Sequence, residues 1–239
     1  MADKIVVAFD LYGTLLSTES ISKQLEEHYD HAKAQSISAL WRRYQLEYTW
    51  RLNSMGRYED FSTITRNSLV HALADNGEQL SDADIKHLMQ AYDGLSTFPD
   101  VKPGLAHIAA DPSIQAMVFS NGTRTMISNS VLRSKDLSLQ AGVFQDIVTV
   151  DEIRQYKPSK ASYEHLARQT RKDPSQMGKL WLVSSNPFDI VGARHAGMQA
   201  IWVDRAGAGW KDAAAPGLQP TAIVQSLEYI VDKIQAHQS

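Results

Sequence analysis

Five short runs of apolar residues, rich in β-branched and aromatic side chains, constrain the fold of this chain more than any other feature. They are Ile5–Phe9, Ala116–Phe119, Ile147–Val150, Leu180–Val183 and Ala200–Val203. Each run is nearly continuous and is bounded by polar residues, glycine or proline, as expected of strands buried on both faces of a parallel sheet. Helical patterns separate the later runs. The sequence therefore predicts an α/β fold with a Rossmann-like, doubly wound parallel sheet.

The stretch between the first and second runs, about 100 residues, has helical periodicity and no convincing strand. Its most regular part places five apolar residues on a single helical stripe, namely Ile37, Leu40, Trp41, Tyr44 and Tyr48. We therefore predict two parts. Residues 1–16 and 98–239 form a Rossmann-like catalytic core, and residues 17–97 form an inserted, all-helical cap.

The composition excludes several classes of protein. With 24 Lys+Arg against 27 Asp+Glu, the chain has no broad basic field, so we expect no nucleic-acid partner. The lack of cysteine excludes disulfide scaffolds, thiolate zinc sites and thiol nucleophiles. The longest apolar runs are far shorter than the roughly 20 residues that span a bilayer, so no membrane partner is expected. Because no secretory signal precedes Ile5, we expect a cytoplasmic protein.

Polar residues follow four of the five apolar runs. They are Asp10 and Thr14 after the first run, Ser120 and Asn121 after the second, Lys157 after the third, and Ser184, Asn186 and Asp189 after the fourth. Ligands of open α/β sheets bind beyond the carboxyl ends of the strands, so these side chains should meet at one edge. Each alone has an ordinary explanation as a turn, cap or solvated residue, but all of them in this order favour a functional site.

These four segments resemble the motifs of the haloacid dehalogenase superfamily. Phe9–Leu15 is similar to the nucleophile loop, and Ser120-Asn121-Gly122 resembles the serine/threonine loop. Lys157-Pro158 matches the lysine motif, and Ser184–Asp189 matches the acidic fourth loop. The resemblance covers essentially the whole chain, and it implies a helical cap inserted after the first strand.

The chemistry of two positions separates this chain from the phosphatases of that superfamily. Phosphatases carry a second aspartate two residues after the nucleophile, where this chain has Tyr12, and a phenol of pKa about 10 is a poor proton donor at neutral pH. Ser184 and Ser185 leave only Asp189 in the fourth loop, so the set of oxygen ligands for Mg²⁺ is depleted. We therefore expect no metal and no cofactor. A halide is a leaving group that needs neither.

The helical insert carries the more specific resemblance, to the type II L-2-haloacid dehalogenases. Trp41-Arg42, Gln45–Trp50 and Met55–Tyr58 are very similar to the cap helix and following loop of that family. The resemblance implies that Asp10 attacks C2 of a short L-2-haloalkanoic acid. Halide leaves with inversion, and water hydrolyses the covalent ester to a D-2-hydroxy acid. It also implies a homodimer formed through the cap.

The same resemblance implies a role for each site residue. Lys157 is the charge partner of Asp10, and Asp189 orients or deprotonates the hydrolytic water. Four polar residues position Asp10 and the substrate carboxylate: Thr14, Ser120, Ser184 and Asn186. Arg42 and Asn121 hold the halide beside an apolar wall, Phe61, and the remaining pocket residues are Tyr12, Leu46, Phe188 and Tyr163. The chain departs from the family at Phe188, where tryptophan is found, and at Arg43, where glutamine is found, which leaves the substrate range open.

Two other functions are compatible with this fold. One is a Mg²⁺-dependent phosphatase, which Tyr12 opposes. The other is a non-catalytic binding protein, which the joint presence of Asp10, Lys157, Asn186 and Asp189 opposes.

Overall fold

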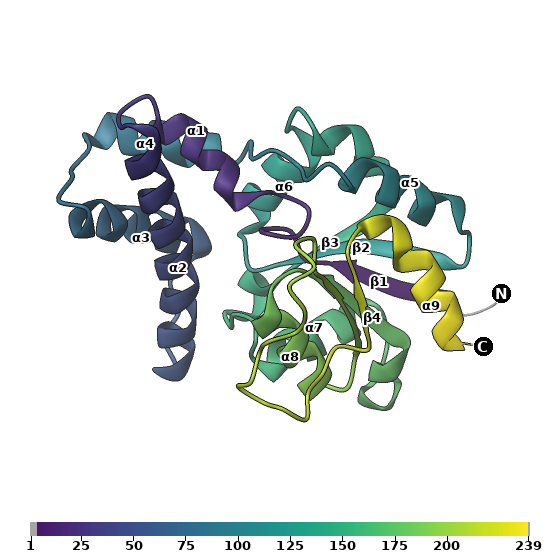
Figure 1. Cartoon of the computed structure of the whole chain (residues 1–239). Helices are drawn as coiled ribbons and strands as arrows, with labels where there is room; N and C mark the ends of the chain where they lie inside the picture. Colours follow the sequence, from purple (N-terminus) through teal and green to yellow (C-terminus); the bar gives the residue numbers. More distant parts are fainter. Residues whose placement is uncertain (1–3, 239) are drawn as a thin grey trace.

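The computed structural model describes residues 4–238, and its centre is a six-stranded sheet in the order β3-β2-β1-β4-β5-β6 (Figure 1). All five pairs of neighbouring strands are parallel. The strands are β1 (Ile5–Phe9), β2 (Ile114–Ser120), β3 (Phe144–Thr149), β4 (Leu180–Ser184), β5 (Gln199–Val203) and β6 (Ala222–Val224). This confirms the predicted α/β class and doubly wound parallel sheet. The sequence did not reveal β6, which has three residues of which only Val224 is buried.

Helices cover both faces of the sheet (Figure 1). One layer contains α5 (Val101–Ala110), α6 (Arg124–Leu132) and α9 (Ile230–Gln238), and the other contains α7 (Lys160–Gln169) and α8 (Pro187–His195). Short 3₁₀ helices complete the connections: η2 (Leu137–Val143), η3 (Val150–Ile153), η4 (Pro174–Lys179) and η5 (Leu227–Tyr229). The central strands β1 and β4 are covered on both faces, which explains why their sequences are apolar without alternation.

The chain between β1 and α5 is helical and lies beside the sheet, at the left of Figure 1. It contains η1 (Thr18–Ile21), α1 (Ser22–Leu25), α2 (His31–Ser54), α3 (Phe61–Asp75) and α4 (Asp82–Tyr92). The three longer helices begin at N-cap side chains, Asp30, Asp60 and Ser81, that accept a backbone N–H of the first turn. The division into domains at residues 17 and 97 stays a prediction. No helix within residues 4–238 combines the length and the hydropathy that a membrane span requires.

The end of α2 is fastened to the core beside the lysine motif. The Asn53 carboxamide donates to the Tyr156 carbonyl at 2.6 Å and accepts from the Tyr156 N–H at 3.0 Å. The Tyr156 hydroxyl donates to the Glu59 carbonyl at 2.6 Å, and its ring stacks on Tyr58 with 5.2 Å between centroids. The helical segment therefore holds the loop that presents Lys157 to the edge of the sheet.

Candidate active site

Asp10 directly follows β1 and is 7% exposed. Its Oδ2 accepts three hydrogen bonds, from Asn186 Nδ2 at 2.7 Å, Thr14 Oγ1 at 2.8 Å and Ser184 Oγ at 3.3 Å. Its Oδ1 accepts from Lys157 Nζ at 3.1 Å. A carboxylate oxygen has two lone pairs, so Oδ2 is fully engaged while Oδ1 keeps one lone pair open. The carboxylate is thus held in one orientation with a single oxygen available to react.

The two hydroxyls that bind Asp10 are themselves oriented by backbone groups. Thr14 Oγ1 accepts from the Ser185 N–H at 2.9 Å, and Ser184 Oγ accepts from the Asn186 N–H at 3.1 Å. Each hydroxyl therefore directs its own proton to Asp10. The nucleophile loop turns at Gly13, whose φ of +87° lies in the region that favours glycine. A Cβ there would also lie 3.4 Å from the Asn186 side chain.

Lys157 has a buried ammonium group with three acceptors. Nζ donates to Asp10 Oδ1 at 3.1 Å, to Asp189 Oδ2 at 2.9 Å and to the Phe119 carbonyl at 2.7 Å. Burial acts to lower the pKa of Lys157, but the carboxylates of Asp10 and Asp189 outweigh it, so the pKa lies above its usual value. Lys157 is therefore a fixed positive charge between two acids.

Asp189 lies in the first turn of α8 and is completely buried. Its Oδ1 accepts from the Tyr163 hydroxyl at 2.7 Å. Burial raises the pKa of Asp189, and the nearby Lys157 ammonium offsets this increase only in part. A carboxylate whose pKa is raised is a better general base, provided that it is ionised at the working pH.

Replacing Tyr163 with phenylalanine should lower both stability and turnover. The change leaves one buried oxygen of Asp189 without its donor, which costs about 1–3 kcal/mol in the free energy of unfolding. Urea unfolding would measure this loss, and turnover should fall because the Asp189 carboxylate loses the hydroxyl that orients it. Wild-type stability together with wild-type turnover would contradict a supporting role of Tyr163 beside Asp189.

The free energy of unfolding should fall at alkaline pH. The folded-state pKa of Lys157 is raised above its ordinary 10.5, and burial raises that of Tyr163 as well. A group with a raised folded pKa contributes stability that is complete below its unfolded pKa and is lost as pH rises through the folded value. Urea unfolding between pH 8 and 12 should therefore show a plateau and then a decline above about pH 10. A rise over that range would contradict the assignment.

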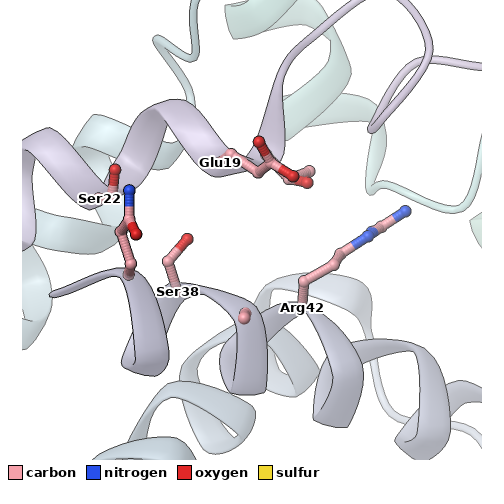
Figure 2. A pocket seen from close by; sticks show the side chains of 7 residues that line it. Glu19, Ser22, Ser38 and Arg42 are labelled. Carbon is pink, nitrogen blue, oxygen red and sulfur yellow. The ribbon is translucent and has the colours of Figure 1, made fainter. Parts of the chain in front are cut away.

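Arg42 extends from α2 to the Asp10 loop. Its Nη2 donates to the Tyr12 carbonyl at 3.0 Å and to Asn186 Oδ1 at 3.3 Å. Its side chain also lines a pocket of about 460 Å³ between α1 and α2, which Glu19 and Ser38 line as well (Figure 2). Arg42 therefore lies between this pocket and the Asp10 carboxylate.

Ser120 and Asn121 extend the site from the end of β2. Asn121 Oδ1 accepts from the Lys157 backbone N–H at 3.0 Å, so its Nδ2 group is the side available to an incoming acceptor. Ser120 is completely buried, and its Oγ accepts from the Gly122 N–H at 3.2 Å.

Two of the aromatic residues predicted for the pocket lie where the helical segment contacts the core. Phe61 is buried and stacks on Tyr12 with 5.7 Å between centroids. Phe188 instead packs edge-to-face against Trp50 of α2, with 5.4 Å between centroids. Leu46 is half-buried on α2, one turn after Arg42. Phe61 and Phe188 thus each take part in an aromatic contact between the helical segment and the core, and their roles beside the substrate stay predictions.

The Tyr12 hydroxyl lies against the serine/threonine loop. It is buried and lacks a hydrogen-bond partner within residues 4–238. A Cβ on Gly122, in that loop, would lie only 3.3 Å from it. Burial raises the pKa of Tyr12 above its ordinary value of 10.0. Tyr12 is consequently unsuited to protonating a leaving group at Asp10.

Comparison with known proteins identifies the family. A model of the haloacid dehalogenase-like hydrolases matches residues 6–197. The chain belongs to this family. It is 34% identical to (S)-2-haloacid dehalogenase H-109 of Pseudomonas putida, over 95% of this chain and 96% of that protein. It is 32% identical to haloacetate dehalogenase H-2 of Moraxella sp. (strain B), over 84% of this chain and 86% of that protein.

Solved structures support the same relationship. The L-2-haloacid dehalogenase of Xanthobacter autotrophicus with chloropropionic acid covalently bound superposes with a TM-score of 0.85. It is 26% identical, and the match covers 97% of this chain and 98% of that one. This dehalogenase family is the one that the sequence motifs resemble, and the chain is a hydrolase of that family.

Several residues that support the site were not predicted from sequence. Arg205 donates to the Thr14 carbonyl at 2.8 Å and to Ser185 Oγ at 3.1 Å, and it pairs with Asp100 at 2.9 Å. Arg205 comes shortly after β5. The rule that polar residues just after parallel strands lie at the ligand edge could therefore have identified it. Gln45 and Tyr92 lie on helices, where the rule about strand ends does not apply.

Proposed function

We propose that this enzyme hydrolyses short L-2-haloalkanoic acids to D-2-hydroxy acids and halide. The observation that carries the proposal is the Asp10 carboxylate, which has one oxygen bound by three donors and the other bound by Lys157 alone. The related proteins of Pseudomonas putida and Moraxella are named as dehalogenases, which supports the same reaction class.

In the first step, Asp10 Oδ1 forms a bond to C2 of the substrate. The carbon–halogen bond breaks from the opposite side, and the halide leaves with the bonding electron pair, so C2 is inverted. A carboxylate is ionised at pH 7 and needs no base for this attack. Arg42 and the Asn121 Nδ2 group are the donors that we assign to the departing halide, with Phe61 as the apolar side of that site.

In the second step, water attacks Cγ of the Asp10 ester. The water proton passes to Asp189 as the water oxygen bonds to Cγ. The bond between Cγ and the reacted oxygen of Asp10 then breaks, and that oxygen takes the proton back from Asp189 and leaves as the hydroxyl of the hydroxy acid. The regenerated Asp10 carboxyl releases its remaining proton to solvent. Lys157 stays protonated in both steps and balances the charge of the two carboxylates. Thr14, Ser184 and Asn186 hold the carboxyl group, and Ser120 contributes to binding the substrate carboxylate.

The alternative of a Mg²⁺-dependent phosphatase is less well supported. A phosphate monoester needs a proton for its alkoxide, and Tyr12 has its hydroxyl against Gly122. The described residues contain no cluster of three or more His, Cys, Asp or Glu side chains that could hold a metal ion. We propose that the reaction needs no metal or cofactor, because a halide leaves without protonation.

The helices between residues 17 and 97 would act as the cap, with Leu46, Phe188 and Tyr163 completing the surroundings of the substrate. We further propose a homodimer formed through this cap, in support of which Val70 of α3 and Met55 at the end of α2 are exposed apolar residues. Light scattering at micromolar concentration would test it. The cytoplasmic location stays a prediction.

The experiment that tests the function is halide release from each enantiomer of 2-chloropropionate in EDTA. We expect release from the L enantiomer alone, with D-lactate as the product. The result that would overturn the proposal is no release from either enantiomer, together with cleavage of p-nitrophenyl phosphate once Mg²⁺ is added. Binding of 2-chloropropionate without turnover would instead favour the non-catalytic alternative.

A further inference from the structure

Gln45 lies on α2 one turn after Arg42, and its carboxamide is completely buried. Its Oε1 accepts from Arg42 Nη1 at 2.8 Å and from the Tyr92 hydroxyl at 3.1 Å. Its Nε2 donates to Thr65 Oγ1 at 2.7 Å. A buried carboxamide is tolerated only where its polar atoms have partners, and here each of them has one. Gln45 thus connects Arg42 to the interior of the helical segment.

The orientation of the Gln45 carboxamide is determined by Thr65. The Thr65 hydroxyl donates its single proton to the Phe61 carbonyl at 2.6 Å, so it can only accept from Gln45. Nε2 must therefore face Thr65, and Oε1 must face Arg42. The hydrogen bonds aim a neutral carbonyl oxygen at the guanidinium group.

The hydrogen-bond partners of Arg42 carry no charge. Its three hydrogen bonds within residues 4–238 go to neutral oxygens, those of Gln45, Asn186 and the Tyr12 backbone. Tyr92 contacts the same Gln45 oxygen as a neutral phenol, because burial raises its pKa. A guanidinium has five N–H donors, so these three bonds do not use all of those on Arg42.

We propose that Gln45 is a positioning residue that aims Arg42 at the departing halide and keeps the guanidinium charge free to attract it. This inference rests on the proposed dehalogenation. A carboxylate in place of the carboxamide would occupy the same volume but would neutralise Arg42. The identity of residue 45 therefore determines how tightly halide binds and how strongly the reaction rate depends on the leaving group.

The test compares Gln45→Glu and Gln45→Met with the matched control Gln90→Glu, an exposed position on α4. The readouts are inhibition of L-2-chloropropionate hydrolysis by chloride and bromide, and the ratio of kcat/KM for L-2-bromopropionate to that for the chloro compound. We expect Gln45→Glu to weaken halide inhibition at least tenfold and to raise the ratio at least fivefold. Chloride is the poorer leaving group of the two, so the rate with the chloro compound falls more when stabilisation of the departing halide is removed. Gln45→Met should weaken inhibition about threefold to tenfold, and the control less than twofold.

The outcomes separate this proposal from the proposed function. If Gln45→Glu or Gln45→Met folds, as judged by its melting temperature, and keeps wild-type halide inhibition and the wild-type ratio, the positioning role is wrong while the dehalogenase function stands. The methionine variant decides the question if the glutamate variant fails to fold. A merely structural role would change the melting temperature without altering the bromo-to-chloro ratio. A wild-type enzyme that releases no halide would overturn the proposed function and this proposal with it.

Discussion

Replacing Asp10 with asparagine should lower halide release by at least about 10⁴-fold, the scale seen when a catalytic nucleophile is removed. The amide is nearly isosteric, so the surrounding loops should keep their positions, but it has no anionic oxygen with which to attack C2. Ion chromatography of chloride released from L-2-chloropropionate would measure the loss.

The matched control is Asp136→Asn, at an exposed aspartate whose side chain caps no helix. It should leave halide release within twofold of wild type. Circular dichroism should show that both variants are folded. Asp10→Asn retaining more than about a tenth of the wild-type rate would show that another group or a water molecule attacks the substrate.

Replacing Lys157 with methionine should destabilise the protein by about 3–5 kcal/mol and remove most of its activity. Lys157 is 1% exposed and is the ammonium between the carboxylates of Asp10 and Asp189. Methionine preserves the length of the side chain but leaves two buried acids facing each other. Urea unfolding at pH 7.5 would measure the change, with exposed Lys135→Met as the control, expected to stay within about 0.5 kcal/mol of wild type.

The pH dependence of this variant distinguishes loss of charge from loss of packing. Without Lys157, repulsion between Asp10 and Asp189 should raise the folded-state pKa of one of them well above its unfolded value. Such a group contributes stability below its unfolded pKa that is lost as pH rises through the folded pKa. The deficit of Lys157→Met relative to wild type should therefore shrink between pH 7.5 and pH 5. A constant deficit would indicate that packing, and not charge, is the cause.

Much of the fold and of the residues around Asp10 could be predicted from sequence, because both follow from local rules. Buried parallel strands are short apolar runs, and the first polar residue after such a run lies at the ligand edge. That rule predicts that Asp10, Lys157 and Asp189 lie close together, as the structure shows. It could not predict β6, where Val224 is buried but Ile223 is exposed, so that no continuous apolar run is present.

The contacts that support the site depend on pairs of residues that the sequence does not connect. Nothing in the pattern of α2 indicates that Gln45 meets Thr65 and Tyr92, which lie on two other helices. The sequence likewise does not indicate that Phe188 of α8 meets Trp50 of α2 where the helical segment packs against the core. Such pairings are tertiary and become visible only when the helices are placed.

The proposed reaction depends on the Asp10 carboxylate itself forming the new bond to C2. A single turnover in ¹⁸O-labelled water, with enzyme in excess over L-2-chloropropionate, tests it directly. The account predicts that the hydroxy acid carries ordinary oxygen, taken from Asp10, and that mass spectrometry finds ¹⁸O in the peptide containing Asp10. Label in the hydroxy acid, with Asp10 unlabelled, would mean that water displaces the halide directly and would contradict the account.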